Sequence, residues 1–346
     1  MTKPTLILML AVTLFCCSCI KETPPVTVDA ASLKYFKALP AVMESPDNPL
    51  SPEKIDLGRM LYYEKRLSLA GDVACNTCHL LDKFGVDGEP TSTGHKGQKG
   101  NRNAPTVYNA AGHFVQFWDG RAKDVEAQAK GPILNPVEMA MPSEKNVTAV
   151  LNSMPAYVQA FKKAFPGAKD PVTFDNMANA IGAFERKLVT PARWDKFLRG
   201  DQAALTPEEK AGFNTFIAAG CQTCHAGAYL GGNLYQKLGV IKPYPDQSDL
   251  GRYQVTRSEG DKMVFKVPSL RNIEKTGPYF HNGKVPALDQ TVAQMGEYQL
   301  GRRLSDAEVK SIVTWLQSLT GEIPAEYVKA PELPKSTART PKANLN

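Results

Sequence analysis

The chain has 346 residues, of which 42% are hydrophobic and 22% charged, so it is long enough for two ordinary globular domains and is not a disordered polymer. The formal net charge is only +6 and Lys and Arg form no continuous run, so we predict no binding to nucleic acid. Gly and Pro occur 26 times each, which indicates many loops.

Residues 1–20 have the features of a secretory signal, with Lys3 before an apolar run from Leu6 to Phe15 that is too short to span a bilayer. A small residue precedes Cys19 at the end of this run, as in bacterial lipoprotein signals. Lipidation of Cys19, which would anchor the protein to a membrane, and ordinary cleavage therefore both stay open. Residues 21–31 are predicted to form a flexible tether.

Helix-start signals occur at matching places in the two halves of the chain. Ser51 is followed by Pro52, and Thr206 by Pro207, which places an N-cap residue before Pro at the first helical position. Thr206 and Glu209 also have the spacing of a capping box. Each predicted helix leads toward a cysteine motif of the same type, and this shared order favours an ancient duplication.

Two further segments have apolar residues at helical spacing, 173–189 and 305–319, and Pro191 ends the first of them. Residues 191–205 are predicted to connect two domains, and no strand-rich region stands out. The predicted fold is mainly α. The predicted segments are an N-terminal domain at 32–190, a C-terminal domain at 191–330 and a loose, Pro- and Lys-rich tail at 331–346.

The motif C-x-x-C-H, which is typical of covalent attachment of a c-type haem, occurs twice. Its residues are Cys75, Cys78, His79, Cys221, Cys224 and His225. The other three of the seven cysteines lie within the first 20 residues, so none is left for a disulfide in the mature chain. Paired C-x-x-C motifs also bind zinc, but the adjoining His, the wide separation and the export signal favour haem. We therefore predict two c-type cytochrome domains, each around one covalently bound haem.

The sixth iron ligands decide which haem only carries electrons and which also performs chemistry. Besides the two motif histidines, the chain has His95, His113 and His281, and His95 lies in a loop with several glycines that would let it move. The only methionines after the second motif are Met263 and Met295, and composition does not distinguish between them.

Four further stretches carry a more specific signal than the haem motifs. They are RNAPT at 102–106, QFWDGR at 116–121, PILNPVEM at 132–139, and VPSLRN at 267–272 followed by TGPYFHNG at 276–283. With the haem motifs, they resemble the bacterial di-haem cytochrome c peroxidases over residues 33–325. The resemblance implies a periplasmic enzyme, commonly a homodimer, that reduces hydrogen peroxide to water at the N-terminal haem. Electrons would come through the C-terminal haem from a cytochrome c or a cupredoxin, or from a quinol if Cys19 carries a lipid.

The resemblance also implies individual roles. His95 matches the distal ligand that blocks the peroxidatic iron at rest, and Met295 matches the distal ligand of the electron-transfer haem. Glu138 matches the catalytic glutamate, Gln128 lines the same pocket, and Trp118 lies between the haems. The apolar, Pro-containing loop around Glu138 suits a carboxyl whose pKa must rise toward neutrality.

Calcium is a further implied cofactor. Asn103, Thr276 and Pro278 match positions that give oxygen ligands to a calcium ion at the domain interface, where hard cations prefer such ligands. His281 matches a residue near the second haem but outside its coordination sphere. No family role is found for His113, which is expected to be a structural or surface residue.

Two other functions compete with the peroxidase. Di-haem relatives that mature methylamine dehydrogenase oxidise a protein substrate and have Tyr at the position of Met295, so the Met favours peroxidase chemistry, although Tyr298 is nearby. A non-catalytic di-haem electron carrier would need both irons six-coordinate, which leaves Glu138, Gln128 and a movable His95 without a purpose. Binding of carbon monoxide or cyanide to the half-reduced protein distinguishes the carrier from the enzymes.

Overall fold

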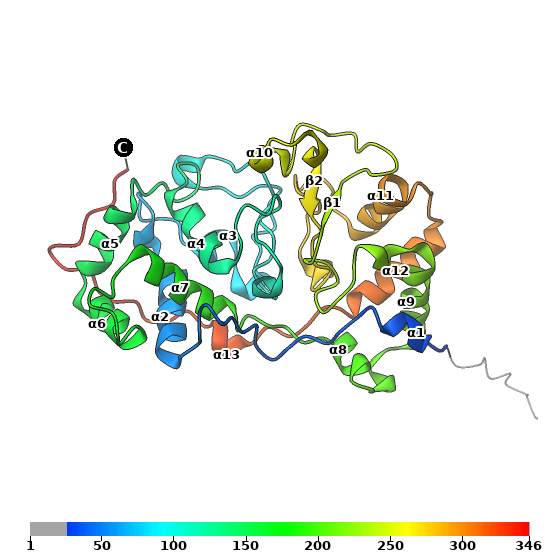
Figure 1. Ribbon diagram of the computed structural model, residues 1–346, viewed down its shortest axis with the longest axis horizontal. Coiled ribbons are helices and arrows are strands. Elements are labelled where there is room, and N and C mark those ends of the chain that lie inside the picture. The colour runs from blue at the N-terminus through cyan, green and yellow to red at the C-terminus, as the bar shows by residue number, and fades with distance from the viewer. Residues whose placement is uncertain (1–25, 346) are drawn as a thin grey trace, which may run out of the picture.

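The computed structural model describes residues 26–345, so the predicted signal segment and Cys19 lie outside the described residues. The chain forms two mainly helical lobes side by side (Figure 1). The first lobe contains α2 (Pro52–Tyr62), α3 (Cys75–Cys78), α4 (Val125–Leu134), α5 (Glu144–Asn152), α6 (Pro155–Ala164) and α7 (Phe174–Glu185). The second contains α8 (Arg193–Leu198), α9 (Pro207–Ala219), α10 (Tyr253–Thr256), α11 (Leu288–Leu300) and α12 (Asp306–Gln317). Within residues 26–345, no helix is both long and apolar enough to cross a membrane.

The predicted helix starts are confirmed. The Ser51 hydroxyl accepts a hydrogen bond from the Lys54 amide at 3.2 Å, and α2 begins at the next residue, Pro52. The Thr206 hydroxyl accepts from the Glu209 amide at 3.2 Å, and the Glu209 carboxylate accepts from the Thr206 amide at 3.0 Å. The helix predicted over 173–189 ends earlier, at Glu185, because the chain then turns to pair with the backbone of a neighbouring loop.

Each lobe has a helix pair that touches at a glycine. A Cβ atom on Gly58 of α2 would clash with the backbone of α7 and lie 2.9 Å from the Phe184 Cβ. A Cβ atom on Gly212 of α9 would clash with the backbone of α12 and lie 2.9 Å from the Trp315 Cβ. Both glycines lie near the middle of the helix that precedes a haem motif, so the close crossing in the two cores supports the duplication inferred from the sequence.

The start of the described chain packs on the second lobe, and its C-terminal segment packs on the first lobe, the reverse of what the predicted domains imply. The ring of Phe36, just after α1 (Ala30–Leu33), lies 5.7 Å from that of Trp194 in the second core. At the other end, α13 (Ala325–Val328) packs on the first core, where the Tyr327 hydroxyl donates to the Phe184 carbonyl oxygen at 2.7 Å. In Figure 1, α1 lies beside α9 and α13 lies below α7. Phe36 of the predicted N-terminal domain and Val328 of the predicted C-terminal domain therefore each pack in the core of the other lobe.

Two other predicted segments also differ from the structure. Residues 191–205 are more than a connection, because Trp194 and Phe197 of α8 are buried in the second core. The tail after residue 330 is not loose, since it runs along the first lobe and makes hydrogen bonds to it. The Thr337 hydroxyl donates to the Ser153 carbonyl oxygen at 2.8 Å, and the Asn344 amide donates to the Leu69 carbonyl oxygen at 2.8 Å.

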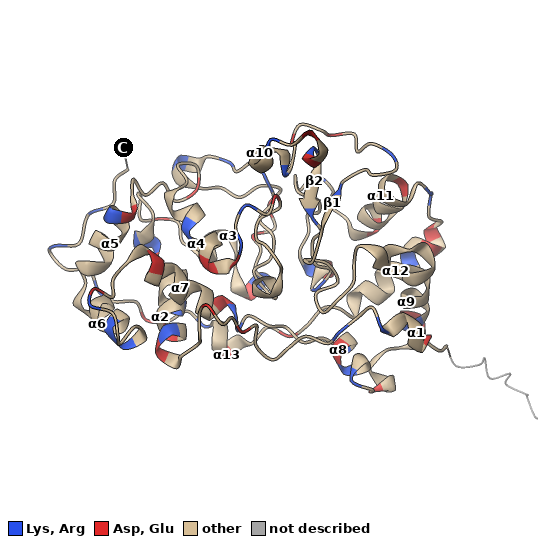
Figure 2. Ribbon diagram, viewed as in Figure 1, with Lys and Arg blue, Asp and Glu red and all other residues tan. Residues whose placement is uncertain are grey.

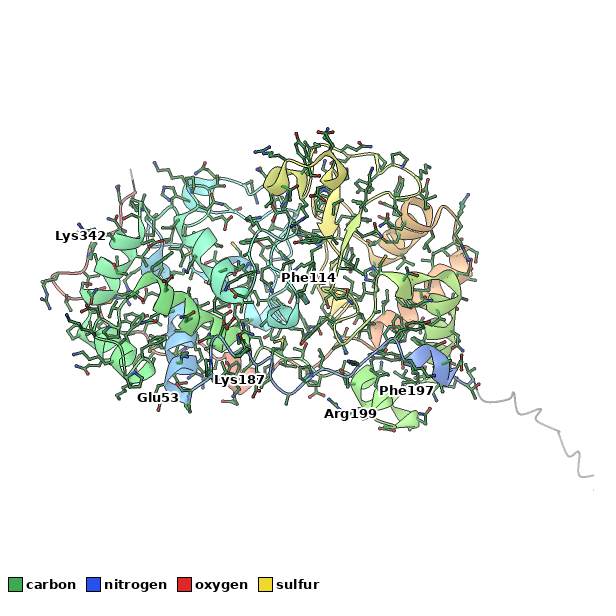
Figure 3. All side chains as sticks on the ribbon, in the orientation of Figure 1. Glu53, Phe114, Lys187, Phe197, Arg199 and Lys342 are labelled. Atoms are coloured by element: carbon green, nitrogen blue, oxygen red, sulfur yellow. The ribbon has the colours of Figure 1, made fainter. Side chains whose placement is uncertain are left out.

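A short antiparallel sheet lies on the side of the second lobe that faces the first. It pairs β1 (Tyr235–Lys237) with β2 (Val264–Lys266), so that Tyr235 is opposite Lys266. Phe114, which comes from the first half of the chain, lies at the junction of the lobes (Figure 3), with its ring 4.9 Å from that of Tyr235. Basic and acidic residues are interspersed over both lobes (Figure 2).

Candidate haem and peroxide sites

The first haem motif forms the short helix α3 and presents its histidine in a fixed orientation. Thr77 Oγ1 accepts from the Ala74 amide at 2.9 Å, and the Tyr62 hydroxyl donates to the His79 carbonyl oxygen at 2.9 Å. His79 Nδ1 lies 3.3 Å from the Gly85 carbonyl oxygen. Because a carbonyl oxygen only accepts, this contact puts the proton on Nδ1 and leaves Nε2 as the nitrogen that would ligate iron.

The second motif opens into a cavity of about 380 Å³. His225 Nδ1 lies 3.1 Å from the Leu230 carbonyl oxygen, which again leaves Nε2 for a metal. Met295 of α11 lines the same cavity, whereas Met263 is buried in the neighbouring core. The apolar part of the lining includes Phe216, Leu238, Leu288, Leu300, Ile312 and Leu316. Two thiols, an imidazole and a thioether on one apolar cavity form a donor set that fits a c-type haem.

His95 is buried, with 6% of its surface exposed, and its Nδ1 has no hydrogen-bond partner within the described part of the chain. Its backbone amide is shared between the carbonyl oxygens of Val137, at 3.1 Å, and Glu138, at 2.8 Å. A Cβ atom on Gly94 would clash with Val137 O and lie 2.7 Å from the Glu138 Cα. The loops that carry His95 and Glu138 are therefore pressed together and joined through their backbones.

The Glu138 carboxyl lies beside the first motif. Burial raises its pKa, an effect that outweighs the opposing hydrogen bond from Asn135 and the charge of Arg121. Asn135 Nδ2 donates to Glu138 Oε1 at 2.7 Å. Burial is the main cause that raises the pKa of the Cys75 and Cys78 thiols, and the nearby charge of Glu138 adds to it. The arrangement gives a partly buried carboxyl that is held at one oxygen and lies near the first haem motif.

Trp118 reaches from the first half of the chain into the wall of the second cavity. Its Nε1 donates to the Asn103 carbonyl oxygen at 2.9 Å, and its carbonyl oxygen accepts from the Lys266 amide at 2.8 Å. Its ring meets that of His281 edge-on at 6.4 Å. Gln128 lies half-buried on α4, upstream of the Glu138 loop.

The three residues expected to bind calcium, Asn103, Thr276 and Pro278, all line the second cavity. Asn103 Nδ2 donates to the Glu89 carbonyl oxygen at 3.0 Å, and Oδ1 accepts no hydrogen bond from residues 26–345. Within those residues, no group of three His, Cys, Asp or Glu side chains is arranged to hold a metal. A cation here would therefore depend on neutral amide and backbone oxygens, which suit calcium chemically but provide no charge.

An ion pair between the lobes was not predictable from the motifs. Arg102 Nε and Nη2 donate to the two carboxylate oxygens of Asp249 at 2.6 and 2.8 Å, and Nη1 donates to Asp119 at 2.6 Å. Arg102 belongs to the recognised RNAPT stretch, but its partner lies 147 residues away, so no local spacing points to it. The pair fixes the loop next to Asn103 against the second lobe.

Comparison with known proteins agrees with this arrangement. Residues 52–203 match the family of di-haem cytochrome c peroxidases. The chain is 47% identical to the cytochrome c551 peroxidase of Pseudomonas aeruginosa over 89% of its own length and 90% of the relative's. It is 46% identical to that of Nitrosomonas europaea over 94% and 98%. The crystal structure of a MauG-like protein associated with microbial copper homeostasis superposes with a TM-score of 0.77 at 28% identity, covering 85% of this chain and 97% of that one. The chain thus belongs to the di-haem cytochrome c peroxidase family.

Proposed function

We propose that the protein reduces hydrogen peroxide to water at the haem attached to Cys75 and Cys78, with electrons that arrive through the haem attached to Cys221 and Cys224. The observation that supports this assignment is the partly buried Glu138 carboxyl, with its raised pKa, beside the first motif. The second cavity instead has a thioether, Met295, in its wall. Peroxide takes up two electrons and two protons to give two waters, and the bound haems supply the iron and the electrons.

Glu138 is the group proposed to move the proton. Its Oε1 is held by Asn135, so Oε2 is free to take a proton from the nearer peroxide oxygen and return it to the farther one as the O–O bond breaks. A raised pKa suits this role, because a carboxyl close to neutrality both accepts and releases a proton at working pH. Gln128 is proposed to line the same pocket, and Trp118 to lie on the electron path between the lobes.

His95 is proposed to occupy the first iron site at rest and to leave it when the second haem is reduced. The unpartnered Nδ1 supports this role, since no hydrogen bond from residues 26–345 holds that nitrogen. The two bonds from the His95 amide to the Glu138 loop are the contacts that such a movement would break. Release of His95 and rearrangement of the catalytic loop would therefore occur together.

The remaining assignments follow from the same proposal. The predicted export signal and the need for haem attachment outside the cytoplasm support a periplasmic location, where a cytochrome c or a cupredoxin would be the donor. Calcium held by Asn103, Thr276 and Pro278 would stiffen the lobe interface next to Trp118. Attachment through Cys19 would bring the enzyme close to membrane donors such as a quinol.

The test is steady-state peroxide reduction by the holo-protein with reduced cytochrome c, before and after one-electron reduction. We expect Glu138→Gln to lower turnover by about 10²- to 10⁴-fold, the usual contribution of general acid–base catalysis. The matched control is Glu144→Gln, which changes an exposed glutamate in the first turn of α5 and is expected to leave turnover unchanged. Equal turnover of the wild type and the Glu138 variant would refute the proposed role, and an electron carrier would show no turnover at all.

A further inference from the structure

Two basic side chains face each other in the wall of the second cavity. Lys266 of β2 has only 6% of its surface exposed, and His113 comes from a loop of the first half of the chain, next to Phe114 at the junction of the lobes (Figure 3). Lys266 Nζ lies 3.3 Å from His113 Nδ1. Neither side chain belongs to the haem motifs or to the proposed peroxide pocket, and the family resemblance implied no role for His113.

The hydrogen bond between them fixes the proton on the imidazole. An ammonium group has no acceptor, so His113 Nδ1 must accept from Lys266, and the imidazole proton must then be on Nε2. His113 Nε2 is buried and has no partner within the described chain. The N–H groups that remain on both side chains are therefore donors, and a buried donor without an acceptor is costly. This part of the wall needs an acceptor that the protein does not supply.

The charge balance leads to the same requirement. Within residues 26–345, no carboxylate forms a salt bridge with Lys266, although sixteen other ion pairs do form. Burial alone lowers the pKa of Lys266 to about 8, and the charge of Lys266 adds to burial in lowering the pKa of His113. An unpaired cation in an apolar wall is destabilising unless an anion lies against it.

We infer that Lys266 and His113 bind a propionate carboxylate of the haem attached to Cys221 and Cys224. Propionates are the anionic groups of a haem, and the cavity that contains both thiols also contains both donors. The haem would then be held at one side by thioethers and at the other by an ammonium and an imidazole N–H. The inference requires haem c in this cavity but not the proposed direction of electron flow.

This contact would tune the second haem. A positive charge against a propionate disfavours the additional positive charge of ferric iron, so it would raise the reduction potential, as ligation by Met295 also would. The contact also joins the two lobes, because His113 and Lys266 come from different halves of the chain and the Lys266 amide donates to the Trp118 carbonyl oxygen at 2.8 Å. A movement at the interface would therefore change the potential of the second haem.

The first experiment is an optical redox titration of the holo-protein with Lys266→Met and Lys266→Arg. Loss of the charge is expected to raise the ferric-to-ferrous ratio of the C-terminal haem about tenfold at a fixed applied potential, equal to a fall of about 59 mV for one electron. The arginine variant keeps the charge and is expected to stay close to the wild type. Lys262→Met is the control, because Lys262 is close in sequence, 43% exposed and paired with Glu259.

A second pair of variants tests the imidazole. These variants test the propionate contact even if Lys266→Met fails to hold haem. His113→Phe keeps the ring that packs edge-on against Tyr229 at 5.5 Å but removes both nitrogens, so the potential should fall. His113→Gln can still accept from Lys266 and donate to a carboxylate, so it should retain most of the wild-type value. An unchanged potential in His113→Phe, or a change confined to the N-terminal haem, would overturn the inference.

Discussion

Gly94 is the position where one methyl group would test the coupling between the His95 and Glu138 loops. A Cβ atom there would clash with Val137 O and lie 2.7 Å from the Glu138 Cα, well inside ordinary contact at about 3.4–4 Å. Gly94 has a φ of −111°, so alanine does not force a left-handed backbone. The substitution Gly94→Ala must therefore push the two loops apart rather than strain one residue.

The magnitude follows from the bonds that join the loops. The His95 amide donates to Val137 O at 3.1 Å and to Glu138 O at 2.8 Å. Loss of both, at about 0.5–1.5 kcal/mol each, weakens the closed arrangement by about 1–3 kcal/mol, or about 5- to 150-fold in the ratio of open to closed protein. If His95 blocks the first iron at rest, as proposed, cyanide binding to the fully oxidised holo-protein should tighten by the same factor, because cyanide would bind where His95 has left. The assay is an optical cyanide titration without prior reduction.

The control is Gly100→Ala in the same loop. A Cβ atom on Gly100 would meet nothing closer than the Ser92 carbonyl oxygen at 3.8 Å, so cyanide affinity should not change. The same cyanide affinity in Gly94→Ala, Gly100→Ala and the wild type would refute the claim that backbone contact with the Glu138 loop holds His95 in place. Turnover is a poorer readout, because a displaced Glu138 would lower it for a separate reason.

Two further predictions concern stability. Asp195→Ala should lower the free energy of unfolding by about 3–5 kcal/mol in denaturant titrations, because it leaves the fully buried Arg271 without the carboxylate that now binds it at 2.7 and 3.0 Å; a loss below about 1 kcal/mol would contradict this. Burial, aided by the charge of Glu126, raises the pKa of Glu185 to about 8. The protonated carboxyl therefore adds to the free energy of unfolding in full below the unfolded pKa near 4.5, and this stabilisation is lost as pH rises through 8. Glu185→Gln should therefore lose less stability than the wild type between pH 5 and pH 9, and parallel pH profiles would show that the carboxyl is not protonated in the fold.

Much of the local structure was predictable because its causes are local. The N-caps at Ser51 and Thr206 and the helices that follow depend on residues within four positions of each other. The haem motifs depend on spacing in the same way. Gly58 and Gly212 could be noticed as a matched pair in the sequence, but their reason, a close helix crossing, is visible only in the packed lobes.

The features that the sequence did not reveal all depend on contacts between distant segments. Each chain end packs on the other lobe through contacts between Phe36 and Trp194 and between Tyr327 and Phe184. The partners are far apart in the sequence, so no helical or strand periodicity predicts these contacts. The burial of Lys266 is hidden in the same way, because a lysine that ends a short strand is usually solvated. The signal that was available is that lysine follows Val264 and Phe265 directly, inside an otherwise apolar strand.

The most direct test of the proposed function is to mix the half-reduced holo-protein with one equivalent of hydrogen peroxide and follow the C-terminal haem by stopped-flow spectroscopy. If peroxide reacts at the first site and draws its electron through the second, the C-terminal haem will be oxidised in the wild type. The same reaction will be slowed by about 10²-fold or more in Glu138→Gln. Oxidation of the C-terminal haem at equal rates in both proteins would contradict the account, because peroxide would then react without the Glu138 carboxyl.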